Sequence, residues 1–270
     1  MSNPTSYSII AAWMLASLAS VAGAAPATQA LTAASPATAN AKAKAKAPAA
    51  PTATNTATAM TTATATAHPA QGKQDVSPAE MLLFQTNHLQ NLQAPATVRY
   101  TFHKEGSAEP GFDDQVRLVL AQGTTSATLE FLSGPRQYTA PPVDNPEGNP
   151  VLLGFLERDI AEMQRLTGGA RNHFRQQIRL ALAEAAQVRA SRFSYAGKTV
   201  DGSEIVIQPY RTDPMRARFE QYADKRYAFV VSPQVPGGVY QVRAAVVGAK
   251  NTPVLLEETL TLAGVDQGRN

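Results

Sequence analysis

The chain of 270 residues contains no cysteine and only one tryptophan. The absence of cysteine excludes disulfides, thiolate zinc sites, a thiol nucleophile and a lipid-modified cysteine. Residues 1–72 contain no acidic side chain, and their only basic ones are Lys42, Lys44 and Lys46. The other 21 of the 24 Lys and Arg lie in residues 73–270, together with all 21 Asp and Glu. That part is formally neutral, which argues against nucleic acid as a partner because such binding depends mostly on phosphate neutralisation.

The first 24 residues predict a signal peptide. Apolar and small residues run from Ile9 to Val21 and are followed by Ala22-Gly23-Ala24, a small-x-small cleavage site. The run is shorter than the roughly 20 residues that a membrane-spanning helix needs. Residues 1–8 contain no Lys or Arg, so an uncleaved anchor stays open as the alternative and as the one predicted link to a membrane. We therefore expect a periplasmic or secreted protein.

Residues 25–75 predict a disordered linker. Ala, Thr and Pro make up 36 of the 48 residues from 25 to 72. Large apolar side chains are nearly absent, so the segment cannot bury enough surface to offset the entropy of ordering. A Thr-rich composition in an exported protein leaves O-glycosylation open. One globular domain is expected over residues 76–265, with a flexible tail over 266–270.

Three helices are expected in this domain. The sequence Ser77-Pro78-Ala79-Glu80 has the spacing of a capping box, and the apolar pattern after it predicts a helix over 78–92. A second helix opens at Asn149-Pro150 and ends at Gly168-Gly169, and a third covers about 170–187. The second helix has an apolar stripe and a charged remainder made of Glu157, Arg158, Asp159, Glu162 and Arg165.

Alternating apolar residues predict strands before and after the last two helices. Val98, Tyr100 and Phe102 show the pattern first, and it recurs five times after residue 190. Strands with one polar face are typical of antiparallel sheets. We predict an α+β domain with a mainly antiparallel, curved sheet of about eight strands packed on a helical hairpin, in a half-barrel-like arrangement.

The order of elements over 76–265 resembles the half-barrel of periplasmic lipoprotein carriers and related lipid-binding envelope proteins. The resemblance is one of organisation, and no sequence motif carries it. It implies a sheet whose hollow face could hold an apolar ligand.

Catalytic and metal-binding patterns are weak. The sequence has no G-x-S-x-G elbow, and His88, His103 and His173 lie in different elements. Glu109, Asp113 and Asp114 surround a turn but lack the spacing of an EF-hand, so we interpret them as a solvated acidic turn. We predict no catalytic residue, no metal and no cofactor, and a hydrolase whose triad is not visible in the sequence remains the second alternative.

Arg171, Arg175 and Arg179 follow one another at intervals of four on the third helix. Like charges at this spacing repel one another, so an opposite charge is expected nearby. Glu157 and Glu162 of the preceding helix could supply it, or the phosphate of an anionic headgroup could.

The leading hypothesis is a non-catalytic envelope protein that acts as an interaction or assembly module with another envelope protein as partner. The alternative is a periplasmic protein that binds lipid or another hydrophobic ligand in a gap between the helices and the sheet. The candidate ligand-binding residues for that alternative are Leu152, Phe155, Leu156, Ile160 and Phe174, with Arg171 and Arg175 at the mouth.

Overall fold

The computed structural model describes residues 76–123, 125–246 and 253–268. The predicted signal peptide and linker, residues 1–75, lie outside the described residues, so they stay predictions. The chain divides into two units after Lys73, and the second unit, Gln74–Asn270, contains the described residues.

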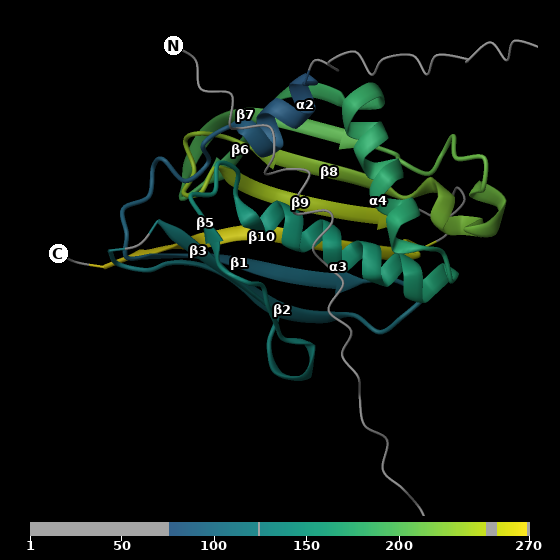
Figure 1. The fold of residues 1–270 in the computed structure, drawn as a ribbon, viewed down its shortest axis with the longest axis horizontal. Helices are drawn as coiled ribbons and strands as arrows, with labels where there is room; N and C mark the ends of the chain where they lie inside the picture. Colours follow the sequence, from purple (N-terminus) through teal and green to yellow (C-terminus); the bar gives the residue numbers. More distant parts are fainter. Residues whose placement is uncertain (1–75, 124, 247–252, 269–270) are drawn as a thin grey trace, which may run out of the picture. The chain divides into compact units, whose positions relative to one another are not determined.

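A single antiparallel sheet of ten strands forms the body of this unit (Figure 1). Its strands follow the order β4-β3-β2-β1-β10-β9-β8-β7-β6, and β5 pairs with β3 beside β4. Among the described residues the two ends of this path do not pair with each other, so the sheet is open. The strands are β1 (Ala96–Glu105), β2 (Phe112–Leu120), β3 (Ser126–Phe131), β4 (Tyr138–Thr139), β5 (Val143–Asp144), β6 (Gln187–Tyr195), β7 (Lys198–Ile207), β8 (Arg226–Val231), β9 (Val239–Val246) and β10 (Leu256–Gln267).

The predicted α+β class and antiparallel sheet are confirmed, since every strand pair in the described part is antiparallel. The sheet has two strands more than the predicted number of about eight, because two strands of only two residues each, β4 and β5, lie in the proline-containing segment between β3 and residue 150. Strand β10 also includes Asp266 and Gln267, the first two residues of the predicted tail.

Pairing of β1 with β10 joins the two halves of the chain. Ala96 to Glu105 run along Gln267 to Glu257, with a bulge between Arg99 and Tyr100. The first strand of the chain, β1, therefore lies beside the last strand, β10, at the middle of the sheet. The helices between these two halves are thus held over one face of a continuous sheet.

Helices α3 (Pro150–Thr167) and α4 (Arg171–Leu180) lie across that face (Figure 1). Asn149 caps α3 by accepting a hydrogen bond from the backbone N–H of Val151, and proline occupies the first helical position. Gly168, at a φ of 69°, ends α3 in the left-handed conformation that favours glycine. The predicted start and end of this helix are confirmed.

The first predicted helix is shorter than expected. Its capping box is present, but α2 (Pro78–Glu80) passes into one π-helical turn, η1 (Met81–Gln85), and the helix ends there instead of at residue 92. The chain leaves the helical path because the imidazole of His88 bonds to the carbonyl of Leu82 and to the backbone of Asn149. The bond to Asn149 joins residues far apart in the chain, so no local sequence pattern predicts it.

The remaining helical segments are short. The third predicted helix continues from α4 as a π-helical turn, η3 (Ala181–Ala185), and ends two residues before the expected Gln187. Two 3-10 segments lie between β7 and β8, η4 (Arg216–Arg218) and η5 (Glu220–Asp224). A further 3-10 turn, η2 (Gly134–Arg136), precedes β4.

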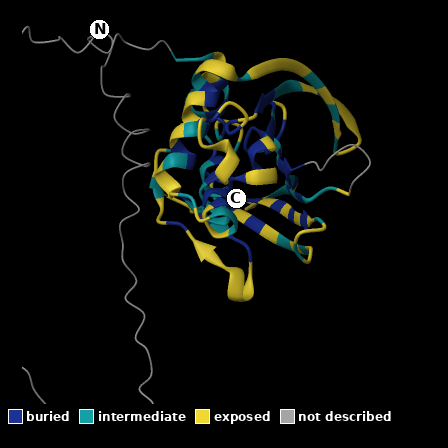
Figure 2. Cartoon of the chain, turned by 90° about the vertical axis from the view of Figure 1, so that its right-hand side faces the viewer, coloured by how far each residue is buried: buried dark blue, intermediate teal, exposed yellow. Residues whose placement is uncertain are grey.

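The core lies between the helices and the sheet. Figure 2 shows buried residues gathered there, with alternating buried and exposed bands along the strands. Gly154 of α3 packs against β3, where an added Cβ atom would come within 2.3 Å of the Leu129 side chain. Glycine at this position therefore lets the helix pack directly on the strand.

Replacing Gly154 by alanine should lower the free energy of unfolding by about 1–3 kcal/mol, because the new methyl group overpacks a buried contact. The higher helix propensity of alanine would offset at most about 1 kcal/mol of this loss. Urea denaturation measures the difference. In a Leu129→Ala background the same substitution should cost much less, and an equal cost in both backgrounds would contradict the proposed contact.

Candidate functional site

The predicted apolar site residues lie together under the helices. Leu152, Phe155, Leu156, Ile160 and Phe174 are all buried. The Phe155 ring lies 6.4 Å from that of Phe102 on β1, measured between centroids. The Phe174 ring lies 5.5 Å from Tyr210 in the segment that follows β7. All five belong to the buried apolar core of the domain, where Phe155 packs on the sheet and Phe174 packs on the segment after β7, and side chains fill these contacts.

The two arginines predicted at the mouth differ in their surroundings. Arg171 is exposed and donates to the side chain of Gln164. Arg175 is nearly buried, and its guanidinium donates two hydrogen bonds, of 2.7 and 2.6 Å, to the carboxylate of Glu157 on α3. These bonds and their charge raise the pKa of Arg175. The expectation that α3 supplies the counter-charge is confirmed for this pair.

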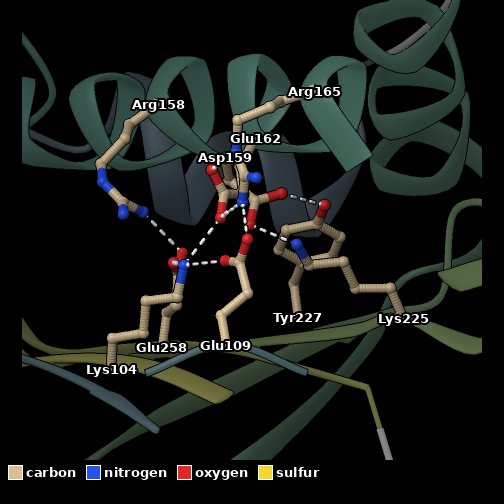
Figure 3. A network of polar contacts seen from close by, with 9 residues as sticks. All are labelled: Lys104, Glu109, Arg158, Asp159, Glu162, Arg165, Lys225, Tyr227 and Glu258. Atoms are coloured by element: carbon tan, nitrogen blue, oxygen red, sulfur yellow. Dashed lines mark hydrogen bonds and ion pairs between the residues drawn. The ribbon is translucent and has the colours of Figure 1, made fainter. Parts of the chain in front are cut away.

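A cluster of six charged residues joins α3 to the sheet (Figure 3). We call it the Lys104 cluster. Lys104 on β1 donates to Glu162 of α3 at 2.7 Å and to Glu109 at 2.8 Å. Arg158 of α3 donates to Glu258 on β10 at 2.7 Å. Arg165 of α3 completes the cluster by pairing with Glu109 and Glu162, so three positive and three negative charges meet.

The charges within this cluster hold one another ionised. Burial alone would raise the pKa of Glu162, but hydrogen bonds from Arg165 and Lys104 outweigh it and lower the pKa to about 2. Burial would lower the pKa of Lys104, yet its bonds to Glu109 and Glu162 raise it. One oxygen of the fully buried Glu258 carboxylate has no hydrogen-bond partner and lies 3.6 Å from the Lys104 ammonium.

A second polar group lies deeper, and we call it the Asp159 site. The carboxylate of Asp159 on α3 accepts one hydrogen bond from Lys225 Nζ and one from the Tyr227 hydroxyl, both at 2.5 Å. Tyr210 lies behind Tyr227, with 3.1 Å between the two hydroxyl oxygens. Both side chains of the Asp159–Lys225 ion pair are completely buried. Figure 3 shows Asp159 pointing from the helix toward Lys225 and Tyr227.

Asp159 and Glu162 were predicted on the polar side of α3, and for Asp159 this was wrong. Asp159 follows Phe155 by four residues and precedes Met163 by four, so it lies on the buried stripe. On the strands, Lys104 comes two residues after the buried Phe102, and Glu258 lies between the buried Leu256 and Leu260. The period of two places both charges on the inner face, and this signal could have identified them.

Uncharged hydrogen bonds fix the start of α3. Asn149 Nδ2 donates to the Tyr100 hydroxyl at 2.9 Å and to the carbonyl of Gly237 at 2.7 Å. Its backbone N–H donates to His88 Nδ1 at 3.2 Å, so Nε2 carries the ring proton and donates to Leu82. Burial lowers the pKa of His88, which agrees with a neutral ring here.

The other two histidines lie elsewhere. His173 on α4 pairs with the buried Asp213 at 2.6 Å. His103, on the outer face of β1, pairs with Asp113 at 2.7 Å, and this hydrogen bond raises its pKa. Within the described ranges no serine or threonine hydroxyl bonds to any of the three histidines.

The residues of the predicted acidic turn have separate partners. Glu109 belongs to the Lys104 cluster, Asp113 pairs with His103, and Asp114 accepts hydrogen bonds from the backbone of Ser133 and from Arg136. The described part of the chain contains no group of three or more histidine and acidic residues arranged to hold a metal ion.

One small pocket of about 70 Å³ lies between the segment after α2 and strands β7 and β8. An engineered cavity that binds benzene is about twice as large, ~150 Å³. Residues on its wall include Leu82, His88, Ser203, Val231 and Pro233. None of the seven predicted site residues lines it.

No protein-family model and no curated protein matches the chain. Among solved structures it is similar to lipoprotein LppX of Mycobacterium tuberculosis, at 8% identity and a TM-score of 0.29, over 64% of this chain and 88% of that one. It is also similar to the LolA superfamily protein NE2245 of Nitrosomonas europaea, at 9% identity and a TM-score of 0.22, over 71% and 94% of the two chains. Because both TM-scores lie below 0.5, we take no functional conclusion from these proteins.

No helix in the described ranges combines the length and the apolar character needed to cross a bilayer.

Acid should weaken the Lys104 cluster through Glu162. Its pKa is about 2 in the folded domain against an ordinary 4.5, so its contribution to stability is complete above pH 4.5 and is lost as the pH falls toward 2. Glu162→Gln should remove this part of the pH dependence, as measured by urea unfolding at pH 7, 4 and 3. The exposed Glu184→Gln serves as the control and should keep the wild-type slope. Equal slopes for wild type and Glu162→Gln would contradict the pKa shift.

Proposed function

We propose that this domain binds an apolar or amphiphilic ligand between the inner face of the sheet and the α3–α4 hairpin. The ligand would contact Leu152, Phe155, Leu156, Ile160 and Phe174, with Arg171 and Arg175 at the entrance. Side chains fill this contact in the structure, so binding requires the hairpin to move away from the sheet. We also propose that the protein acts outside the cytoplasm, as its predicted signal peptide indicates.

The observation that carries this proposal is the mixed character of the contact between α3 and the sheet. A permanent core contact is expected to be apolar throughout. Here the apolar side chains share the contact with two polar groups, the Lys104 cluster and the Asp159 site. A buried ion pair adds little net stability, because its attraction is offset by the cost of removing both charges from water. When the hairpin moves away both partners are hydrated again, so separation costs less than it would for an apolar contact of equal size.

A disulfide between α3 and β3 tests whether the hairpin must move. An added Cβ at Gly154 would lie 3.7 Å from Leu129 Cγ, the atom whose place sulfur takes in Leu129→Cys, so cysteines at 154 and 129 would bring their side chains together as a disulfide requires. Leu129→Cys also removes the atoms that the new side chain would meet. Because the natural chain has no cysteine, no other thiol can compete.

We expect the oxidised double variant to bind the apolar fluorophore 1-N-phenylnaphthylamine much more weakly than its reduced form, and reduction to restore binding. Native mass spectrometry of protein purified from membranes should show bound lipid for wild type and little for the oxidised variant. The single variant Leu129→Cys controls for the space left in the core. Undiminished binding by the oxidised form would exclude this site.

A second candidate function is the interaction module that leads the sequence hypotheses, and strand β6 favours it. In the described part of the chain β6 pairs only with β7, so its outer edge ends the sheet. Such an edge can add a strand from an extended segment of another protein. Val188 on β6 is also one of the few large apolar side chains that are exposed. Pairs alternate between bonded and non-bonded along the β6–β7 ladder from the Tyr195–Lys198 turn, so the N–H of Ala190 faces the free edge. Replacing Ala190 by proline should therefore weaken binding of such a partner, as measured by envelope crosslinking, without changing fluorophore binding.

A further inference from the structure

The Asp159 site has the composition of a carboxylate-binding site. Its two donors, the Lys225 ammonium and the Tyr227 hydroxyl, both belong to the sheet side, and each contacts a different oxygen of the carboxylate at 2.5 Å. Lys225 follows η5 and directly precedes β8, the strand that contains Tyr227. The acceptor comes from α3, the element that the proposed function requires to move.

The hydroxyl groups of this site act as donors toward the carboxylate. Burial first, and then the charge of Asp159, hold the pKa values of Tyr227 and Tyr210 well above the ordinary 10.0. Tyr227 donates its proton to Asp159, so the bond between the two tyrosines must be donated by Tyr210. One ammonium and a chain of two hydroxyls therefore all direct protons toward one anion.

Movement of the hairpin would affect the ion pairs of Lys104 and Lys225 differently. Lys104 would keep Glu109 and Glu258, which both come from outside α3. Lys225 would lose Asp159, the one carboxylate that pairs with it in the described part of the chain. A ligand that covered this ammonium without bringing a counter-charge would bury an unpaired charge again, which is strongly unfavourable. A ligand that enters this space is thus favoured if it brings one negative charge to Lys225.

We propose that Lys225, Tyr227 and Tyr210 form the headgroup site for a long-chain carboxylate, and that Asp159 occupies this site while α3 lies on the sheet. This inference rests on the proposed function, because it requires the ligand to replace α3 on the inner face. Asp159 then acts as an internal competitor, and the acyl chain of the ligand covers the apolar surface that α3 leaves.

Three probes separate the headgroup from the chain: oleate, oleyl alcohol and acetate, each measured by displacement of the fluorophore and by calorimetry. We expect oleate to bind at least about tenfold more tightly than oleyl alcohol, since only oleate compensates Lys225. Acetate should not bind detectably, because it lacks the chain. Equal affinities for oleate and oleyl alcohol would overturn the headgroup site and leave the proposed function intact. Binding of neither would overturn both.

Two variants test the residues. Asp159→Leu combined with Lys225→Met removes both charges, and replacement of a whole buried ion pair by apolar residues is often tolerated. This double variant should still bind oleyl alcohol, and its affinities for oleate and oleyl alcohol should be about equal. Asp159→Asn removes the competitor at nearly constant shape and should raise the affinity for oleate several-fold. A preference for oleate that persists in the double variant would overturn the site.

The control variant replaces Arg192 by Gln and Asp201 by Asn, an exposed ion pair on strands β6 and β7. It should leave all three affinities unchanged. A role of the Asp159–Lys225 pair in stability alone predicts instead that Asp159→Asn weakens folding, as seen in urea unfolding, without any gain in oleate affinity. That result would also overturn the proposal.

Discussion

A charge buried away from water needs an opposite charge beside it, and this constraint governs how α3 lies on the sheet. The inner face of the sheet is not apolar throughout, since Lys104 and Glu258 project from it and Lys225 lies at the start of β8. Each of the three meets a residue of α3, namely Glu162, Arg158 and Asp159. Close apolar packing at Gly154 already limits how the helix lies on the sheet, and the ion pairs add a second requirement that only one register meets.

Two kinds of interaction hold α3 on the sheet. At its start, α3 is fixed by uncharged hydrogen bonds of Asn149 to Tyr100, Gly237 and His88. Further along, the helix depends on ion pairs, whose partners can be exchanged for water or for another anion. Binding by replacement suits such a contact, because what holds the helix is chemically similar to what a ligand headgroup offers.

The two ends of the sheet also differ. Strands β4 and β5 at one end are only two residues long, and such short edge strands have few free backbone groups with which another chain could pair. Strand β6 at the other end has nine residues and is exposed over most of its length. An apolar ligand under the hairpin and a protein at the edge of β6 would therefore use separate surfaces, and the domain could bind both.

Much of the fold follows from the sequence, because local patterns decide it. Alternation places Val98, Tyr100 and Phe102 on one face, and Asn149 and Gly168 mark the ends of α3 through the backbone bonds that helix ends lack. The salt bridge from Arg175 to Glu157 also follows, since both residues lie on neighbouring helices of a short hairpin.

The polar site depended on the tertiary structure. The period of each element indicates that Lys104, Glu258 and Asp159 face inward, but each pair joins residues far apart in the chain, such as Asp159 and Lys225. Which charge meets which is set by how the strands pair and where α3 crosses them. The sequence by itself determined the long strands, α3 and most of their buried faces, because local patterns set them, while only the packed sheet decided that an aspartate of the helix would rest on a lysine and a tyrosine.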